Sequence, residues 1–270
     1  MNGLKDLVLA GAAGLSDTLA SPILVRLNAR AKWWRLGRFP LRSKSCSKIG
    51  VVRVGSRIIR ISVPESEKSY HEWEFNHLYC DDPYQLAALP SGLRTVLDVG
   101  GNVGLFSILA RHYFPLAVIH SYEPTPEIFS MLRSNTECIG VIAHNAGVAA
   151  YDGHAHIVSG NGPSLYNRLQ VADGGEIRMV SIRSAIELLG GAVDLLKLDC
   201  EGGEWDILGD RESLKRVKYL AMEYHLLEGT SASLWELVRL LKAEGFAIDS
   251  LRESGNRVVG LLTARNLGIA

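Results

Sequence analysis

Acidic side chains stand where short apolar segments end, and these positions suit ligand chemistry. Asp98 precedes the pair Gly100-Gly101, Glu123 follows an apolar segment, and Asp199 follows the almost wholly apolar run 193–198. In open α/β sheets, ligands bind beyond the carboxyl ends of the strands. Carboxylates at this edge suit a ligand that carries positive charge and hydroxyl groups. We therefore expect these acids to contribute to one ligand site.

The segment VLDVGGNVG (residues 96–104) predicts a strand, a glycine-rich turn and a helix. Glycine lets a ligand approach the backbone, and a helix N-terminus favours negative charge. The dinucleotide pattern G-x-G-x-x-G fails in both frames, since Asn102 and Leu105 occupy its glycine positions in one frame and bulky residues do so in the other. An acid before the first glycine disfavours a pyrophosphate and suits S-adenosylmethionine, which has an ammonium and a sulfonium. The residues expected to hold this cofactor are Asp98, Gly100, Gly101, Asn102 and Gly104.

A second cofactor contact is expected at Glu123, which stands 25 residues after Asp98. A carboxylate at the end of the second strand can accept hydrogen bonds from both ribose hydroxyls. Asn145 and Ala146 follow the next expected strand, and we place them near the adenine.

The acceptor side is expected after the run 193–198 and in the segment MEYH (222–225). Charged groups beyond an apolar strand are rarely there for stability. His225 has the pKa range of a general base and is the first candidate to take a proton from an acceptor hydroxyl, followed by Asp199 and Glu201. Alternatively, these two carboxylates could hold Mg²⁺, which prefers oxygen ligands. The residues leave this choice open.

Other polar residues receive less weight. Glu204 is interpreted as a favourable charge in the first turn of a helix. His154 and His156 share one face of an expected strand and are interpreted as surface residues, since two histidines without a third ligand are a weak metal signal. Ser164 and Tyr166, in a glycine-rich stretch, are expected to help form the acceptor side.

Alternation of strand and helix patterns from residue 91 predicts an α/β fold with a mostly parallel sheet covered on both faces. Residues 1–90 are expected to form a basic extension with a helix, a β-hairpin and a helix, and 91–270 the catalytic domain. The expected strands are 95–99, 117–122, 141–149, 179–182, 193–198 and 219–222, with an antiparallel pair at 246–251 and 258–263. The expected helices are 105–113, 126–137, 184–189 and 234–243, and the extension holds a hairpin at 49–63 and a helix at 68–79.

The charges are balanced overall but segregated along the chain. The chain of 270 residues has 29 basic and 29 acidic residues, yet residues 18–64 hold eleven basic residues and no acid, and 65–270 carry a net charge of −10. This asymmetry predicts an anionic partner, either the acceptor or a membrane surface that contacts residues 20–48, where Trp33 and Trp34 lie among arginines. The alternative is that this basic segment forms a helix that packs on the rest of the protein. No nucleic-acid motif is present.

Further features bear on location. No run is long enough for a membrane-spanning helix. The four cysteines are far apart, which favours reduced thiols in a cytoplasmic protein, peripheral at the inner membrane face if the basic segment binds lipid.

The ordered motifs resemble the FkbM family of S-adenosylmethionine-dependent methyltransferases. The resemblance covers residues 95–225 and rests on VLDVGGNVG, YEPTPE with Asn135 after it, NAG (145–147), LLKLDCEGGEWDIL (195–208) and MEYH. Gly101, Cys200 and Gly203 replace the alanine, valine and alanine usual there. The resemblance implies a seven-stranded Rossmann-like fold and methyl transfer to a hydroxyl of a natural product, sugar or surface glycan. The rival interpretations are a Rossmann oxidoreductase and a membrane-binding protein whose body only binds ligand.

Overall fold

The computed structural model describes residues 48–158, 168–172, 174–226, 233–254 and 258–269. The chain divides into two compact units, Met1–Asp82 and Pro83–Ala270. Residues 20–47 of the segment predicted to contact a membrane surface lie outside the described residues. Ser164 and Tyr166, predicted to help form the acceptor side, also lie outside them.

The described part of the first unit is a β-hairpin followed by a helix. Strands β1 (Lys48–Val54) and β2 (Arg57–Ser62) pair antiparallel, and Gly55 in the turn between them has a φ of +56°. A short 3₁₀ turn, Glu65–Glu67, leads into α3 (Lys68–Asn76), which continues as a π-helical turn over His77–Asp81. The predicted hairpin and helix are confirmed.

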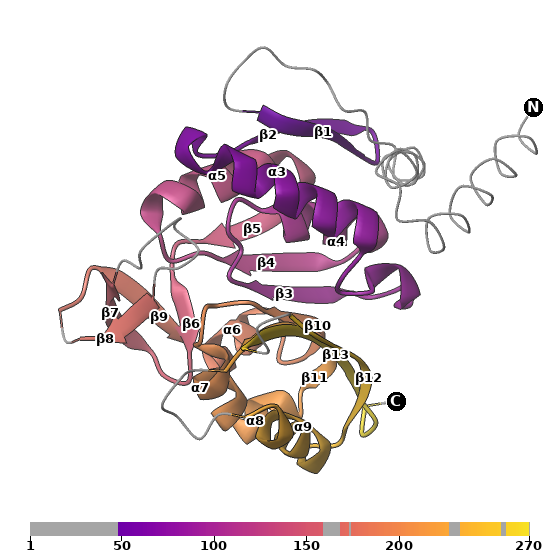
Figure 1. Ribbon diagram of the computed structural model, residues 1–270, viewed down its shortest axis with the longest axis vertical. Coiled ribbons are helices and arrows are strands. Elements are labelled where there is room, and N and C mark those ends of the chain that lie inside the picture. Colours follow the sequence, from indigo (N-terminus) through magenta and orange to yellow (C-terminus); the bar gives the residue numbers. More distant parts are fainter. Residues whose placement is uncertain (1–47, 159–167, 173, 227–232, 255–257, 270) are drawn as a thin grey trace, which may run out of the picture. The chain divides into compact units, whose positions relative to one another are not determined.

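The second unit is built on a seven-stranded sheet, drawn in Figure 1, with the order β12-β13-β11-β10-β3-β4-β5. All neighbouring strands pair parallel except β13, which is antiparallel to both of its neighbours. The strands are β3 (Thr95–Val99), β4 (Val118–Tyr122), β5 (Val141–His144), β10 (Val193–Leu198), β11 (Val217–His225), β12 (Phe246–Glu253) and β13 (Val259–Asn266). The predicted α/β fold with a mostly parallel, Rossmann-like seven-stranded sheet is confirmed.

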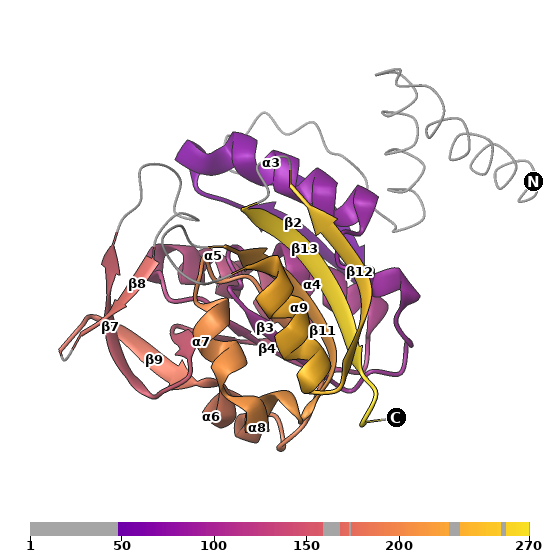
Figure 2. The same ribbon diagram turned by 60° about the horizontal axis from the view of Figure 1, so that its bottom comes forward.

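Helices cover both faces of this sheet. Figures 1 and 2 show α4 (Leu105–Tyr113) and α5 (Pro126–Thr136) on one face. The other face is covered by α6 (Ile182–Leu188), α7 (Glu204–Gly209), α8 (Arg211–Leu214) and α9 (Leu234–Ala243). Two 3₁₀ turns, Leu86–Ala88 and Glu137–Ile139, complete the helical elements of the described part of this unit.

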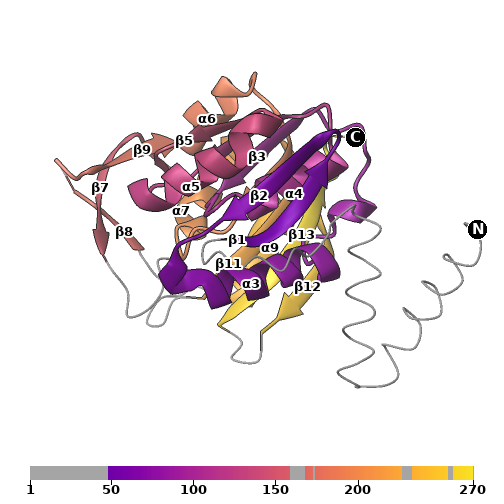
Figure 3. The same ribbon diagram turned by 90° about the horizontal axis from the view of Figure 1, so that it is seen from above.

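A smaller four-stranded sheet, in the order β6-β9-β7-β8, projects from the second unit and is seen from another direction in Figure 3. Its strands are β6 (Gly147–Ala149), β7 (Gly153–Val158), β8 (Arg168–Val171) and β9 (Ile177–Ser181). The single strand predicted over 141–149 is wrong, because it divides at Asn145-Ala146 into β5 and β6 of different sheets. As predicted, His154 and His156 are exposed on one strand, β7.

None of the helices in the described part of the chain has the length and apolar character needed to cross a membrane.

Candidate functional site

The register of three neighbouring strands gathers charged side chains on one face of the sheet. Lys197 on β10 pairs with Asp98 on β3 and with Ala221 on β11. Because side chains alternate along a strand, Asp199, Glu223 and His225 continue on this face. We call these five charged residues, Asp98, Lys197, Asp199, Glu223 and His225, the polar row. The intervening residues, including Leu97, Val99, Leu196 and Leu198, lie in the hydrophobic core on the opposite face.

The polar row begins with a buried ion pair. Asp98 is fully buried, and its Oδ2 accepts hydrogen bonds from Ser107 Oγ at 2.6 Å and Ser121 Oγ at 2.8 Å. Lys197 Nζ lies 3.4 Å from Asp98 Oδ1 and donates to Gly100 O at 2.5 Å. The carboxylate of Asp98 is therefore directed inward, toward α4, β4 and Lys197. It fixes the start of the glycine loop, and its direct contact with a cofactor stays a prediction.

The glycine loop is held against the next strand and passes close to β10. The N–H groups of Gly100 and Gly101 both donate to Tyr122 O. Gly100 has a φ of +79°, and a Cβ there would lie 1.7 Å from Asp199 O. Only glycine fits this position, since the backbones of the two loops nearly touch. Asn102 also has a positive φ, +46°, and Gly104 immediately precedes α4.

Glu123 is fixed by backbone groups on both sides. Its Oε2 accepts from Asn102 N at 3.0 Å, and its Oε1 accepts from Thr125 N at 2.9 Å. Burial raises the pKa of Glu123, and the hydrogen bonds from Thr125 and Asn102 oppose this shift. Asn145 Nδ2 donates to the carbonyl oxygens of Glu123 and Pro124. The structure thus brings Asn102, Glu123 and Asn145 together.

Ala146, the other residue expected near the adenine, has an exposed fraction of only 2 % and packs in the core. Its side chain is therefore directed into the protein.

The loop after β10 contains a residue with a positive φ, as the glycine loop does at Asn102. Glu201 has a φ of +54°, which is uncommon for a residue with a Cβ and recurs at functional sites. The loop is held by Glu204, whose carboxylate is fully buried and accepts from Cys200 N at 2.8 Å and Gly202 N at 3.0 Å. These bonds explain why an acid stands at the start of α7. Burial and the neighbouring acids Glu204 and Asp199 raise the pKa of the Cys200 thiol well above its usual value.

His225 is held between two carboxylates. Its Nδ1 lies 3.2 Å from Glu204 Oε1, and its Nε2 lies 3.3 Å from Glu201 Oε2. Ionised carboxylates only accept hydrogen bonds, so this arrangement favours a proton on both ring nitrogens. Burial opposes that charge, but Glu204, Glu201 and Asp199 outweigh it and raise the pKa of His225 to about 9. An imidazolium has no lone pair for a proton, which weighs against His225 as a general base; that role stays a prediction.

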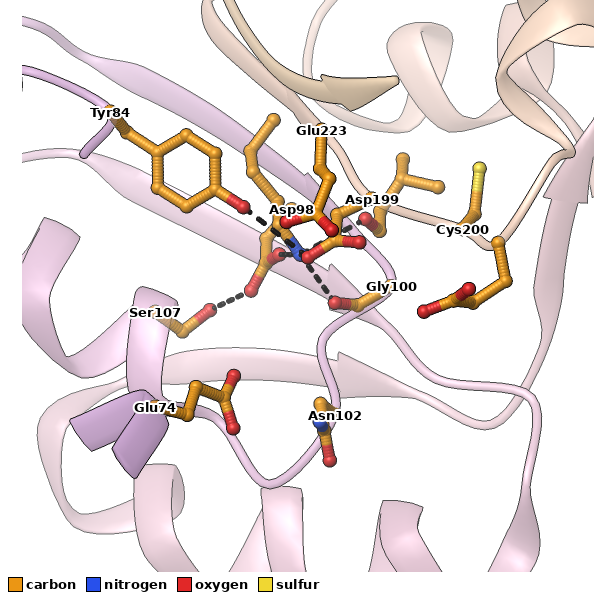
Figure 4. Close-up of polar contacts among 12 residues, drawn as sticks. Glu74, Tyr84, Asp98, Gly100, Asn102, Ser107, Asp199, Cys200 and Glu223 are labelled. Carbon is orange, nitrogen blue, oxygen red and sulfur yellow. Dashed lines mark hydrogen bonds and ion pairs between the residues drawn. The ribbon is translucent and has the colours of Figure 1, made fainter. Parts of the chain in front are cut away.

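The carboxylates of Asp199, Glu201 and Glu223 lie together at the end of the polar row. Asp199 Oδ2 accepts from Tyr84 Oη at 3.3 Å and lies 3.5 Å from Lys197 Nζ. In Figure 4, the Glu223 carboxylate points toward that of Asp199. Burial, followed by the charges of Asp199 and Glu201, raises the pKa of Glu223 to about 8, although His225 and Lys197 oppose the shift. These side chains form the partly exposed acidic end of the site.

The described residues do not support the Mg²⁺ alternative, because no group of three or more His, Cys, Asp and Glu among them is arranged to hold a metal ion. Sequence reasoning missed Tyr84, Lys197 and Glu223. Glu223 lies inside the quoted MEYH segment and two residues before His225, so strand alternation was a signal that could have found it. Tyr84 carried no such signal.

Comparisons with known proteins identify relatives of the chain. The family model described as "Methyltransferase FkbM domain" matches residues 98–257. "Methyltransferase 1" of Beauveria bassiana is 28% identical over 210 residues, which cover 66% of this chain and 82% of that protein. "31-O-demethyl-FK506 methyltransferase FkbM" of Streptomyces tacrolimicus is 25% identical and covers 72% of this chain and 86% of its own length.

Among solved structures, Aeropyrum pernix fibrillarin with natively bound S-adenosyl-L-methionine aligns with a TM-score of 0.45 and 14% identity, over 83% of this chain and 85% of that chain. The family match itself spans more than half of the chain and contains the glycine loop, Glu123 and the polar row. The chain therefore belongs to the FkbM methyltransferase domain family.

Proposed function

We propose that the chain is an S-adenosylmethionine-dependent methyltransferase that methylates a hydroxyl oxygen of a natural product, a sugar or a glycan. The observation that carries this proposal is the geometry of Glu123 beside the glycine loop. Each of its two carboxylate oxygens accepts one backbone N–H, so each retains acceptor capacity. This pair of acceptors suits the two adjacent ribose hydroxyls of the cofactor.

Asn102 supports the same assignment. Its Oδ1 is buried and has no hydrogen-bond partner within the described residues. Since a buried acceptor without a donor is costly, this oxygen suits a donor group of a ligand at the loop. The close approach of the loop to Asp199 O connects this cofactor side to the acidic end of the site.

Methyl transfer then depends mainly on positioning. When bound, S-adenosylmethionine supplies a methyl group on an electrophilic sulfonium. Holding the acceptor oxygen in line with that methyl group makes the reaction effectively unimolecular. The acceptor hydroxyl must also lose its proton, and a positioned side chain accelerates that transfer. Partly exposed acids after β10 and near the end of β11 suit a hydroxyl donor, which supports oxygen as the methylated atom.

Calorimetric titration with S-adenosylhomocysteine tests the cofactor assignment. Glu123→Gln should weaken binding about 10- to 100-fold, since hydrogen bonds to a charged group contribute about 1.5–3 kcal/mol. Glu127→Gln is the matched control, because Glu127 is exposed in the next helix. Absence of binding by the wild type, or equal binding by both variants, would contradict the assignment.

The acceptor atom needs a separate measurement. Incubation of the wild-type protein with ¹³C-methyl-labelled cofactor and an extract of the source organism should give a product with the methyl shift of an O-methyl ether. A shift typical of N-methyl or C-methyl groups would exclude O-methylation. The product would also name the acceptor.

The basic segment remains a prediction for residues 20–48. Within the described residues, Arg53, Arg57 and Arg60 are exposed. Binding of the full chain to anionic vesicles that weakens with added salt would support a membrane role.

A further inference from the structure

Glu223 differs from the other carboxylates around it. Its one ion pair among the described residues is with His225 Nε2 at 3.8 Å, which is beyond hydrogen-bond distance. Asp199 accepts from Tyr84, and Glu204 accepts from two backbone N–H groups. Glu201 lies closer to His225, at 3.3 Å. Glu223 is therefore the acid of this cluster that retains the most acceptor capacity.

Accessibility points the same way. The side chain of Glu223 is 33% exposed, compared with 24% for Glu201 and 11% for His225. Glu204 is fully buried. A proton acceptor must reach the acceptor hydroxyl, so burial removes Glu204. His225 has both ring nitrogens directed at carboxylates, and Asp199 faces Lys197 at 3.5 Å.

We propose that Glu223 is the catalytic base of the methyl transfer and that His225 is a positioning residue, a fixed cation beside it. The inference rests on the proposed function and identifies the proton acceptor of that same site. It replaces His225, Asp199 and Glu201 in that role. Glu204 then acts through His225, because its carboxylate holds Nδ1 while Nε2 faces Glu201 and Glu223.

Methyl transfer forms one bond, breaks another and releases one proton. A lone pair of the acceptor oxygen forms the bond to the methyl carbon while the bond from that carbon to sulfur breaks, and sulfur keeps the electron pair of the broken bond. The hydroxyl proton passes to a carboxylate oxygen of Glu223. Glu223 later releases this proton to water, so the protein returns to its starting state without another reactant.

The groups that face Glu223 set the pH at which it can act. They are Lys197 from β10, Asp199 and Glu201 from the loop that follows β10, and His225 from β11. Burial and the two acids raise the pKa of Glu223 to about 8, near the range in which a general base is most effective. The ionised form increases as the pH rises through this value. A bound sulfonium would shift the value downward, so turnover should rise with a midpoint at or below about pH 8.

The experiment compares kcat across pH 6–10 with saturating cofactor and the acceptor identified by the labelling experiment. Glu223→Gln should lower kcat about 10²- to 10⁴-fold, which is the usual contribution of a general base. Its affinity for S-adenosylhomocysteine should stay within about twofold of the wild type. Glu212→Gln is the matched control, because Glu212 is an exposed acid on α8.

Two further variants separate catalysis from structure. Glu223→Ala should regain part of its activity when formate is added, which a merely structural role would not produce. His225→Gln should keep more activity than Glu223→Gln, and its pH midpoint should rise, since loss of a nearby cation raises the pKa of a carboxyl group.

Full activity of Glu223→Gln, loss of its cofactor affinity, or no rescue by formate would overturn the inference. A profile in which His225→Gln alone abolishes turnover would also overturn it and would restore His225 as the base. Failure of the wild type to bind S-adenosylhomocysteine is a different result, because it contradicts the proposed function itself.

Discussion

The acids at the ends of β3 and β4 and those at the ends of β10 and β11 have opposite environments. Asp98 and Glu123 are buried, and hydroxyl or backbone N–H groups donate to their carboxylates. Asp199, Glu201 and Glu223 are partly exposed and lie close to one another. Neutral donors hold both carboxylates of the first pair, and Lys197 is in addition the ion-pair partner of Asp98. In the second set, by contrast, the acids raise the pKa of Glu223 by like-charge repulsion.

In the proposed function, this difference separates cofactor binding from proton transfer. Carboxylates held by several hydrogen bonds have a fixed geometry, which suits recognition of a cofactor. Among the second set, burial and the neighbouring acids raise the pKa of Glu223 to about 8, so this carboxylate can take up a proton near neutral pH, which suits proton transfer. Lys197 joins the two regions, because it contacts both Asp98 and Asp199.

The largest expected effect comes from Lys197→Met. The substitution leaves Asp98 buried without its counter-ion, and removal of one partner of a buried pair costs about 3–5 kcal/mol. Urea denaturation at pH 7 measures the loss in unfolding free energy. The double variant Asp98→Asn/Lys197→Met should lose less than the sum of the single variants. A cost below about 1 kcal/mol for Lys197→Met would show that the two regions are not joined in this way.

Gly100→Ala should cost about 3 kcal/mol. The left-handed backbone contributes about 1–2 kcal/mol, and the contact with Asp199 O adds an overpacking cost of about 1–3 kcal/mol. Gly174→Ala is the matched control, since its φ of +82° is similar and nothing lies within 4 Å of its Cβ position. Thermal denaturation of the two variants should differ clearly. Equal losses of stability in the two variants would mean that the close approach of the glycine loop to Asp199 O does not constrain residue 100.

Glu204→Gln tests the charges at the acidic end. The wild-type pKa of His225 is raised from 6.5 to about 9, so its stabilising contribution is full below pH 6.5 and disappears as the pH rises through 9. Ionisation of Glu223 likewise lowers the stability as the pH rises from about 4.5 to 8, because the folded state binds the Glu223 proton more tightly than the unfolded state does. Glu204→Gln should lower the His225 pKa measured by NMR and should reduce the loss of stability between pH 6 and 9. An unchanged titration of His225 would contradict its contact with Glu204.

Tyr84→Phe should have the smallest effect. It removes one hydrogen bond to Asp199, which is 3.3 Å long and contributes about 0.5–1.5 kcal/mol at most. Urea denaturation should show a loss in that range, while binding of S-adenosylhomocysteine stays unchanged. A loss of cofactor affinity would instead place Tyr84 on the binding side of the site.

Local patterns in the chain predicted the central elements well. The bounds of β3, α4, β10 and α9 agree with the expected residue ranges. Glycines or acids follow β3, β10 and α9 directly, while α4 begins after Gly104 and ends just before Phe114-Pro115. The glycine-rich stretch was different. A strand around His154 and His156 was expected there and is β7, but β8, which pairs with it, was not predicted.

The parts of the site that were missed depend on contacts between distant residues. Glu204 has a sufficient local explanation as a charge at a helix start, yet its partner His225 is 21 positions away. Tyr84 meets Asp199 across 115 positions. The strand breaks at Asn145, whose side chain donates hydrogen bonds to Glu123 and Pro124. These partners lie more than 20 positions earlier in the chain, so the local sequence around Asn145 does not reveal them.

The place of β13 has a consequence for synthesis of the chain. Val259–Asn266 is the last of the seven strands along the sequence, yet it lies between β11 and β12. While the chain emerges from the ribosome, β3, β4 and β5 can pair early, but β11 keeps an open edge until β13 arrives. The segment that carries Glu223 and His225 is thus completed late. Ribosome stalling near residue 255 should leave a nascent chain whose cofactor side can form before its reactive side does.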